Sequence, residues 1–194
     1  MKTFFIVFVF CFYFILAADI LDHPCRTTVS AKENFSTGFY SGIWFELYNN
    51  EHAFDGNCIT HRYGRRGTQH VFDVDRSYIF DHVFYEQYTN VSVTNPEEVP
   101  MRAFLNGTAV YPDGTVNEYE YQIYATDYAN YSLLWSCRPV GEDQSIELVS
   151  ILGRSKTMSE SVLAKADALL GLIGFNSETF RVVGQSEEVC TVNP

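Results

Sequence analysis

Short runs of β-branched and aromatic residues, separated by Gly, Pro, Asn and Asp, fill the chain from Gly42 to Arg154. This region lacks the apolar spacing of about 3.6 residues that marks an amphipathic helix, so it predicts antiparallel strands joined by turns. The triplets PDG and GED, which begin at Pro112 and Gly141, are strong turn signals. Eight strands are expected, at residues 43–48, 58–64, 70–79, 83–93, 100–105, 116–125, 131–137 and 146–154.

Strands in an up-and-down order favour closure into a barrel, because closure removes the unpaired edges of an open sheet. A barrel of about eight strands has an interior just wide enough for side chains or one small ligand. The competing all-β architecture is a sandwich of about nine strands. The chain lacks the Cys, Trp, Cys arrangement of immunoglobulin domains. The predicted fold class is therefore an all-β, eight-stranded antiparallel up-and-down β-barrel.

The apolar spacing becomes helical after the last predicted strand. Thr157 and Glu160 can form the two ends of a capping box, and Gly171 and Gly174 are expected to end the helix. Because the barrel interior is too small for a helix, we expect its apolar face to pack outside the barrel. Residues 179–183 are a candidate for a further strand before Cys190. The apolar face comprises Val162, Leu163, Ala166, Leu169, Leu170 and Ile173.

The N-terminus has the pattern of a secretory signal peptide. Lys2 precedes an apolar run over residues 4–16, and the small residues Ala17 and Ala18 follow it. The run is about 13 residues, shorter than the roughly 20 that a membrane-spanning helix needs. We therefore expect a signal peptide at residues 1–18 and a single secreted, extracellular domain at residues 19–194.

Four cysteines remain once the signal peptide has removed Cys11. An even number in an oxidising compartment predicts two structural disulfides, and no C-x-x-C or paired-histidine spacing indicates a metal site. Spacing alone leaves all three pairings open. The four cysteines are Cys25, Cys58, Cys137 and Cys190. Secretion agrees with N-glycosylation sequons at Asn34, Asn90, Asn106 and Asn130.

Charge and motifs narrow the function classes. With 13 basic and 24 acidic residues, the net charge of −11 disfavours nucleic acid and anionic membrane surfaces as partners. No G-x-S-x-G, H-E-x-x-H or G-x-G-x-x-G motif occurs, so we expect neither an enzyme nor a required cofactor. A homo-oligomer is compatible with the sequence. Haem carriage through a histidine is an alternative, with candidates His23, His52, His61, His70 and His82.

Three separated motifs resemble those of the lipocalins. Gly42-Ile43-Trp44 opens the first strand, Thr126-Asp127-Tyr128 lies between strands six and seven, and Arg154 closes strand eight. The resemblance covers nearly the whole chain after the signal peptide. It implies that Trp44 plugs the closed end of the barrel and that Arg154 stacks on its indole. These residues, with the turn at Thr126 and Asp127, would therefore hold the barrel shut without doing chemistry.

Residues 125–131 with Cys137, and residues 151–156, resemble the arthropod lipocalin branch that includes bilin-binding protein, insecticyanin and apolipoprotein D. Gly153 departs from that branch, where Ser is commoner. The resemblance implies disulfides Cys25–Cys137 and Cys58–Cys190. It also implies a carrier of one small hydrophobic ligand, with a biliverdin-type bilin favoured, bound non-covalently. A fatty acid, pheromone, carotenoid, biogenic amine, or a storage or allergen-like role are alternatives.

Strand alternation proposes the inward residues of the pocket. On strand six, burial favours Tyr119, Tyr121 and Ile123 over Glu118, Glu120 and Gln122. If the sequon residues Asn106 and Asn90 face solvent, then Met101, Ala103, Leu105, Val83, Tyr85 and Gln87 face inward and Arg102 outward.

The resemblance puts Trp44, Arg154 and the Thr126 turn at the closed end of the barrel. The open end, or mouth, is therefore expected at residues 49–57, 80–82, 111–115 and 138–145. Arg65 and Arg66 would lie at the far end. We expect the ligand to lie against Tyr85, Tyr119, Tyr121 and either Leu134 or Trp135. Donors for its carboxylates at the mouth would be His52, His82 and Arg138.

Overall fold

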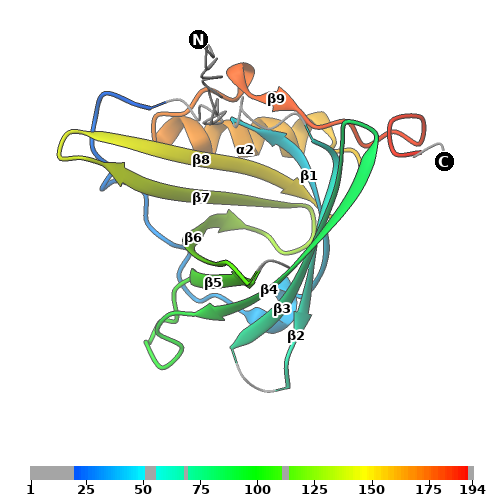
Figure 1. The fold of residues 1–194 in the computed structure, drawn as a ribbon. Helices are drawn as coiled ribbons and strands as arrows, with labels where there is room; N and C mark the ends of the chain where they lie inside the picture. The colour runs from blue at the N-terminus through cyan, green and yellow to red at the C-terminus, as the bar shows by residue number, and fades with distance from the viewer. Residues whose placement is uncertain (1–19, 51–55, 68–69, 111–113, 192–194) are drawn as a thin grey trace, which may run out of the picture.

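Eight antiparallel strands close into a barrel in the computed structural model (Figure 1), which describes residues 20–50, 56–67, 70–110 and 114–191. Each strand pairs with the next along the chain, and β1 pairs with both β8 and β2, which closes the ring. The strands are β1 Gly42–Asn49, β2 Asn57–Arg65, β3 Val71–Phe80, β4 Val83–Val93, β5 Phe104–Val110, β6 Val116–Thr126, β7 Tyr131–Val140 and β8 Gln144–Gly153. The predicted barrel is confirmed. A short β9, Arg181–Val182, pairs with Tyr48 and Asn49 at the end of β1, within the range expected for a further strand.

The fifth strand is displaced from its predicted position. It was expected at residues 100–105, but β5 begins at Phe104 and continues through Gly107 to Val110. Pro100 has no backbone N–H to donate to a neighbouring strand, which disfavours a strand at that position. Gly107 lies inside the strand and does not form a turn. A Cβ at Gly107 would lie 2.5 Å from Cζ of Tyr119, so only glycine leaves room for that ring.

The predicted helix exists, but its start differs from the expectation. Helix α2 (Glu160–Leu172) begins after Ser159, which is the N-cap residue and makes no side-chain capping bond. The expected Thr157 capping box is therefore wrong. Gly171 lies within α2, and Gly174, with φ +82°, follows its end. Figure 1 shows α2 outside the barrel, and its residues Ala166 and Leu170 pack in one cluster with side chains of β7 and β8. The remaining helices are α1 (Thr37–Tyr40) and a 3-10 turn, Ser177–Thr179.

Aromatic side chains fill the closed half of the barrel. The Tyr40 ring lies 5.1 Å from Trp44 and 5.0 Å from Tyr63, and Tyr63 lies 5.3 Å from Phe72, as centroid distances. All four side chains are buried. Because this half is packed solid, any ligand space must lie in the other half, toward the β3–β4 and β7–β8 turns.

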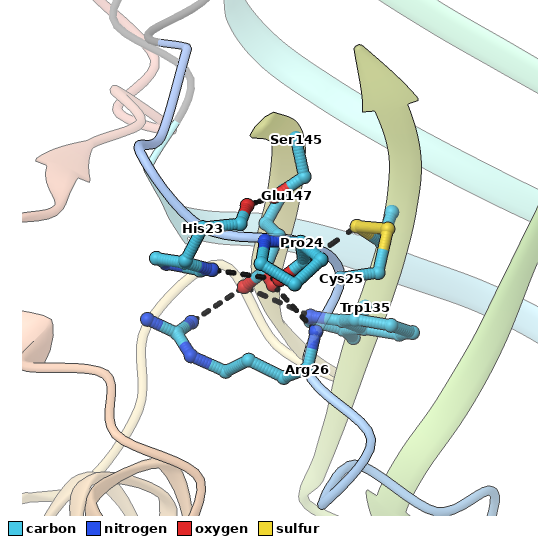
Figure 2. The surroundings of a disulfide bond; sticks show 8 residues. His23, Pro24, Cys25, Arg26, Trp135, Ser145 and Glu147 are labelled. Carbon is cyan, nitrogen blue, oxygen red and sulfur yellow. Dashed lines mark hydrogen bonds and ion pairs between the residues drawn. A yellow bond between two sulfur atoms is a disulfide. The ribbon is translucent and has the colours of Figure 1, made fainter. Parts of the chain in front are cut away.

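Two disulfides fasten the chain ends to the barrel wall. They join Cys25 to Cys137 of β7 and Cys58 of β2 to Cys190, the pairs that the resemblance implies. Figure 2 shows the first one beside the buried Glu147, which accepts from the backbone N–H of Arg26 at 3.1 Å and pairs with its guanidinium at 2.5 Å. The N-terminal segment is therefore held on the outer face of β7 and β8 by a covalent bond and an ion pair.

Candidate ligand-binding site

A cavity of about 350 Å³ opens in the half of the barrel that the aromatic cluster leaves free. Its wall takes residues from β1, β2, β3, β4, β6, β7 and β8. The volume is near the lower end of the roughly 300–1,000 Å³ that small-molecule sites span. The barrel can therefore hold a compact ligand, or one part of a longer ligand.

Three tyrosines form one side of this cavity. The hydroxyls of Tyr63 and Tyr121 share a hydrogen bond of 3.1 Å, and the rings of Tyr119 and Tyr121 stack with centroids 5.9 Å apart. Burial raises the pKa of Tyr63 and Tyr121 well above the ordinary tyrosine value. Their hydroxyls are therefore neutral at physiological pH and can donate or accept hydrogen bonds toward a ligand.

A charged cluster occupies a neighbouring part of the wall, where His61 lies two residues from Tyr63 on β2. Oε2 of Glu46 lies 2.8 Å from Nε2 of His61, while Oε1 accepts from Nδ2 of Asn49 at 2.6 Å and from Oγ of Ser150 at 3.3 Å. Arg76 of β3 lines the same cavity. The wall thus carries a carboxylate and a guanidinium, with an imidazole beside them.

The carboxylate of Glu46 is ionised in spite of its burial. Burial alone would raise the pKa of Glu46, but the hydrogen bond from His61 and the positive charge of Arg76 lower it to about 2. An ionised carboxylate in a cavity requires charged or hydrogen-bonding partners, and Glu46 has them in the wall itself.

This wall is more polar than the apolar pocket expected of a carrier. From the sequence, inward residues are derived only for β4, β5 and β6, so Glu46 and Arg76 receive no role, and His61 is named only as a candidate haem ligand. A signal was present for one of them: Glu46 follows Trp44 by two residues and therefore shares its inward face. The bulge between Glu46 and Tyr48 comes after that position, so it does not change the alternation of inward and outward side chains between Trp44 and Glu46.

The predicted pocket residues fall into three groups. Tyr119, Tyr121 and Leu134 line the cavity. Met101, Leu105 and Ile123 belong to the packed core below it. Trp135 alternates with Leu134, packs with the outer cluster beneath α2, and reaches the cavity only at the gap between β6 and β7.

Tyr85, predicted in the pocket, and His82 and Arg138, predicted as donors at the mouth, do not line the cavity. Tyr85 is 40% exposed and stacks on Tyr78, with centroids 5.2 Å apart. It shares the inward parity of Gln87, but this part of β4 extends beyond the enclosed space. His82 is exposed in the β3–β4 turn, Arg138 is exposed on β7 opposite Ile146, and His52 lies outside the described residues.

The residues expected to close the barrel lie at its packed end. The Arg154 guanidinium carbon lies 3.7 Å from the centre of the Trp44 ring. Arg154 donates to the carbonyls of Ile43, Phe39, Tyr40, Ser41 and Tyr128 at 2.8–3.1 Å. Gly42 has φ +106°, and a Cβ there would lie 3.1 Å from Nη1 of Arg154.

The Thr126 turn beside this end is held by its own side chains. Oγ1 of Thr126 accepts from the N–H of Tyr128 and donates to the carbonyl of Tyr131. Asp127 Oδ1 accepts from the backbone N–H groups of Ala129, Asn130 and Tyr131. These contacts shape a turn and leave no group directed at a ligand.

The described residues offer few side chains that could ligate a metal ion or a haem iron. Within residues 20–50, 56–67, 70–110 and 114–191, no group of three or more His, Cys, Asp or Glu side chains could hold a metal ion. Of the histidines proposed as haem ligands, only His61 lines the cavity in that part of the chain, and it is bonded to Glu46. Over the same described residues, no helix has the length and apolar character to cross a membrane.

Comparison with known sequences finds similarity to one family model and to curated relatives. The profile of the Lipocalin / cytosolic fatty-acid binding protein family matches residues 104–187. Apolipoprotein D from Oryctolagus cuniculus is 26% identical over 163 residues, which is 81% of this chain and 81% of that protein.

Two solved structures have similar folds. Insecticyanin from the tobacco hornworm Manduca sexta has a TM-score of 0.78 at 19% identity, covering 90% of this chain and 93% of its own. A biogenic amine-binding protein has a TM-score of 0.66 at 17% identity, covering 87% of this chain and 91% of its own.

Proposed function

We propose that the chain is a lipocalin that carries a small hydrophobic ligand, and that this ligand is a linear tetrapyrrole of the biliverdin type, bound non-covalently. The proposal is for binding without catalysis. The branch resemblance at residues 125–131 and 151–156 favours this ligand class within the family.

The mixed polarity of the cavity wall is the observation that carries the proposal. A fatty acid has one carboxylate and a long apolar tail, so it needs a polar group at one end only. The wall instead offers polar side chains on several strands, including Gln87, Asn117, Ser136 and Ser150, among stacked tyrosine rings. A linear tetrapyrrole has pyrrole N–H groups, lactam carbonyls and propionates along a flat conjugated frame, which matches a distributed set of partners.

Arg76 and His61 are the proposed partners of the propionates. Both line the cavity, and Arg76 is a permanently charged donor suited to a carboxylate. They take the place of the mouth donors His82 and Arg138, which lie outside the cavity wall.

Titration with biliverdin tests the assignment. Saturable quenching of tryptophan emission at one pigment per chain is expected, because Trp135 lines the cavity. Arg76→Gln should weaken binding about tenfold, the effect of roughly 1.4 kcal/mol of lost charge-assisted bonding. The matched control is Arg65→Gln, which removes an exposed arginine at the closed end and should bind like the native protein. If biliverdin causes no saturable quenching of tryptophan emission, while an unlabelled fatty acid displaces a fluorescent fatty acid, the ligand would be a fatty acid.

A cationic amine is the second candidate, because Glu46 is an ionised carboxylate in the cavity wall. A neighbour in the structure comparison is named a biogenic amine-binding protein. Glu46→Gln separates the two candidates. It should abolish binding of an aromatic amine such as tryptamine. Biliverdin should still bind and no more weakly, since the loss of the carboxylate leaves His61 and Arg76 free for the propionates.

We also propose that the protein is secreted and glycosylated, with residues 1–18 removed as a signal peptide. Two disulfides support an oxidising compartment. The asparagines of all four sequons, Asn34, Asn90, Asn106 and Asn130, are exposed. N-terminal sequencing and glycopeptide mass spectrometry of protein from expressing eukaryotic cells test this. An N-terminus at Met1 in protein from the medium would contradict it.

A further inference from the structure

Two of the four glycosylation sequons lie side by side on neighbouring strands. One begins at Asn90 on β4 and the other at Asn106 on β5. In the antiparallel ladder, Asn90 lies opposite Thr108 and Asn106 lies opposite Ser92, so each asparagine faces the hydroxyl residue of the other sequon. The two asparagines are therefore diagonal neighbours across the two strands.

Burial alternates along both strands, which fixes the direction of these side chains. On β4, Asn90 is exposed between the buried residues Thr89 and Val91. On β5, Asn106 is exposed between two buried residues in the same way. Both carboxamides thus point to solvent from the outer face of the barrel, as the attachment of a bulky glycan requires.

An exposed aromatic residue precedes each of these asparagines by two positions. Phe104, which is 40% exposed, precedes Asn106, and Tyr88, which is 62% exposed, precedes Asn90. Residues two apart on a strand share one face, so each ring stands beside its asparagine on the outer surface. The Tyr88 hydroxyl donates to Oε2 of Glu86 at 3.0 Å, and most of Tyr88 stays exposed in spite of that bond.

The other two sequons lack this arrangement. Lys32 precedes Asn34 by two positions. Tyr128 precedes Asn130 by two positions, but that segment is a turn, and the Tyr128 ring stacks on Phe35 with centroids 6.2 Å apart. Among the four sequons, an exposed ring beside an outward asparagine on one strand face is therefore confined to β4 and β5.

We propose that the first N-acetylglucosamine of an N-glycan at Asn106 packs on the ring of Phe104, and that the first sugar at Asn90 packs on Tyr88. One face of this sugar presents C–H groups, which are attracted to the negative face of an aromatic ring, and the contact removes apolar ring surface from water. The inference rests on the proposed glycosylation. It goes beyond it by giving both glycans a part in stability and by making the outer face of β4 and β5 a carbohydrate-covered surface.

A double-mutant cycle on glycoprotein from eukaryotic cells tests the contact. The melting temperature is measured for the native protein, Phe104→Ala, Asn106→Gln and the double variant. Phe104→Ala should lower the melting temperature by about 2–4 °C more with the Asn106 glycan than in the Asn106→Gln background, the shift expected for one aromatic contact in a domain of this size. The same cycle with Tyr88→Ala and Asn90→Gln tests the second pair.

Phe84→Ala is the matched control. Phe84 is 53% exposed and shares the outward face of β4, but neither residue two positions from it is an asparagine. Its effect on the melting temperature should therefore be the same with and without either glycan. Trimming the glycans to the first sugar with an endoglycosidase should leave both couplings intact, because the proposed contact needs that sugar alone.

Glycopeptide mass spectrometry separates failure of glycosylation from failure of the contact. Absence of a glycan at Asn106 would contradict glycosylation there and overturn the contact with it. A glycan at Asn106, together with equal effects of Phe104→Ala in the two backgrounds, would overturn the Phe104 contact while glycosylation stands. The same two results at Asn90 decide the Tyr88 contact. Couplings that vanish on trimming to the first sugar would overturn the inference for both rings.

Discussion

Glu46 couples the ligand cavity to the stability of the fold. Its pKa is lowered from 4.5 to about 2 in the folded protein, so the folded state holds the ionised form more strongly than the unfolded chain does. The resulting stability is fully present above pH 4.5 and is lost as the pH falls toward 2. A depression of this size corresponds to about 3 kcal/mol at neutral pH.

Urea unfolding of Glu46→Gln and the native protein between pH 2.5 and 6 measures this contribution. The variant should be less stable at pH 6, and the difference should shrink steadily as the pH falls. Glu118→Gln, at an exposed carboxyl on β6, is the control and should follow the native curve. A constant difference between native and Glu46→Gln across the range would show that the charge of Glu46 is not its cause.

Arg154 is predicted to be a residue of stability and not of binding. Arg154→Ala removes five donated hydrogen bonds to backbone carbonyls and the contact with the Trp44 ring. The free energy of unfolding should fall by about 3 kcal/mol, because the carbonyls lose a charged donor. Calorimetry checks this against Arg65→Ala, an exposed arginine at the same end, which should melt like the native protein.

The residues that the sequence predicts correctly lie in local motifs, whereas those it does not predict depend on contacts between strands. Trp44 and Arg154 belong to a closed end whose packing is fixed by local motifs, so their roles follow from the motifs. The cluster of Glu46, His61 and Arg76 joins three neighbouring strands, β1, β2 and β3, in which His61 lies opposite Arg76. Each looks like an ordinary polar strand residue until the register between these strands is known.

Gly107 shows how one residue decides the position of a strand. The predicted fifth strand ends at residue 105, before Gly107, whereas β5 continues through Gly107 to Val110. In the barrel Gly107 pairs with Tyr119 across β5 and β6 and gives space to that ring, which lines the cavity. The start of α2 has a similar cause, since Thr157 and Ser159 are both acceptable N-cap residues and only the packed chain selects Ser159.

Two glycine substitutions should therefore have opposite effects. Gly107→Ala places a Cβ 2.5 Å from Cζ of Tyr119, so the ring must move, with an expected loss of about 1–3 kcal/mol in unfolding free energy. Gly171→Ala lies within α2 with no neighbour within 4 Å of its Cβ, and should stabilise by about 0.5–1 kcal/mol. Chemical denaturation measures both. Gly107→Ala as stable as the native protein would mean that Tyr119 does not pack there.

At the scale of the whole molecule, the barrel is divided into a packed aromatic end and an open polar end. The architecture was predictable, because strand periodicity, three distant motifs and the following helix all indicate the same closed sheet. The place where the β6–β7 ladder stops could not be predicted, because strand length alone gives no register.

The same architecture limits how a pigment can be held. All four cysteines of the described residues are in disulfides, so none supplies a thiolate for a thioether bond to a tetrapyrrole. Bound biliverdin should therefore separate completely from the chain on denaturation in guanidinium without reductant. Size-exclusion chromatography in denaturant, with absorbance recorded in the visible range, measures this. A native-state run is the control, in which pigment and protein should elute together. Pigment that stays with the unfolded, disulfide-intact chain would contradict non-covalent binding.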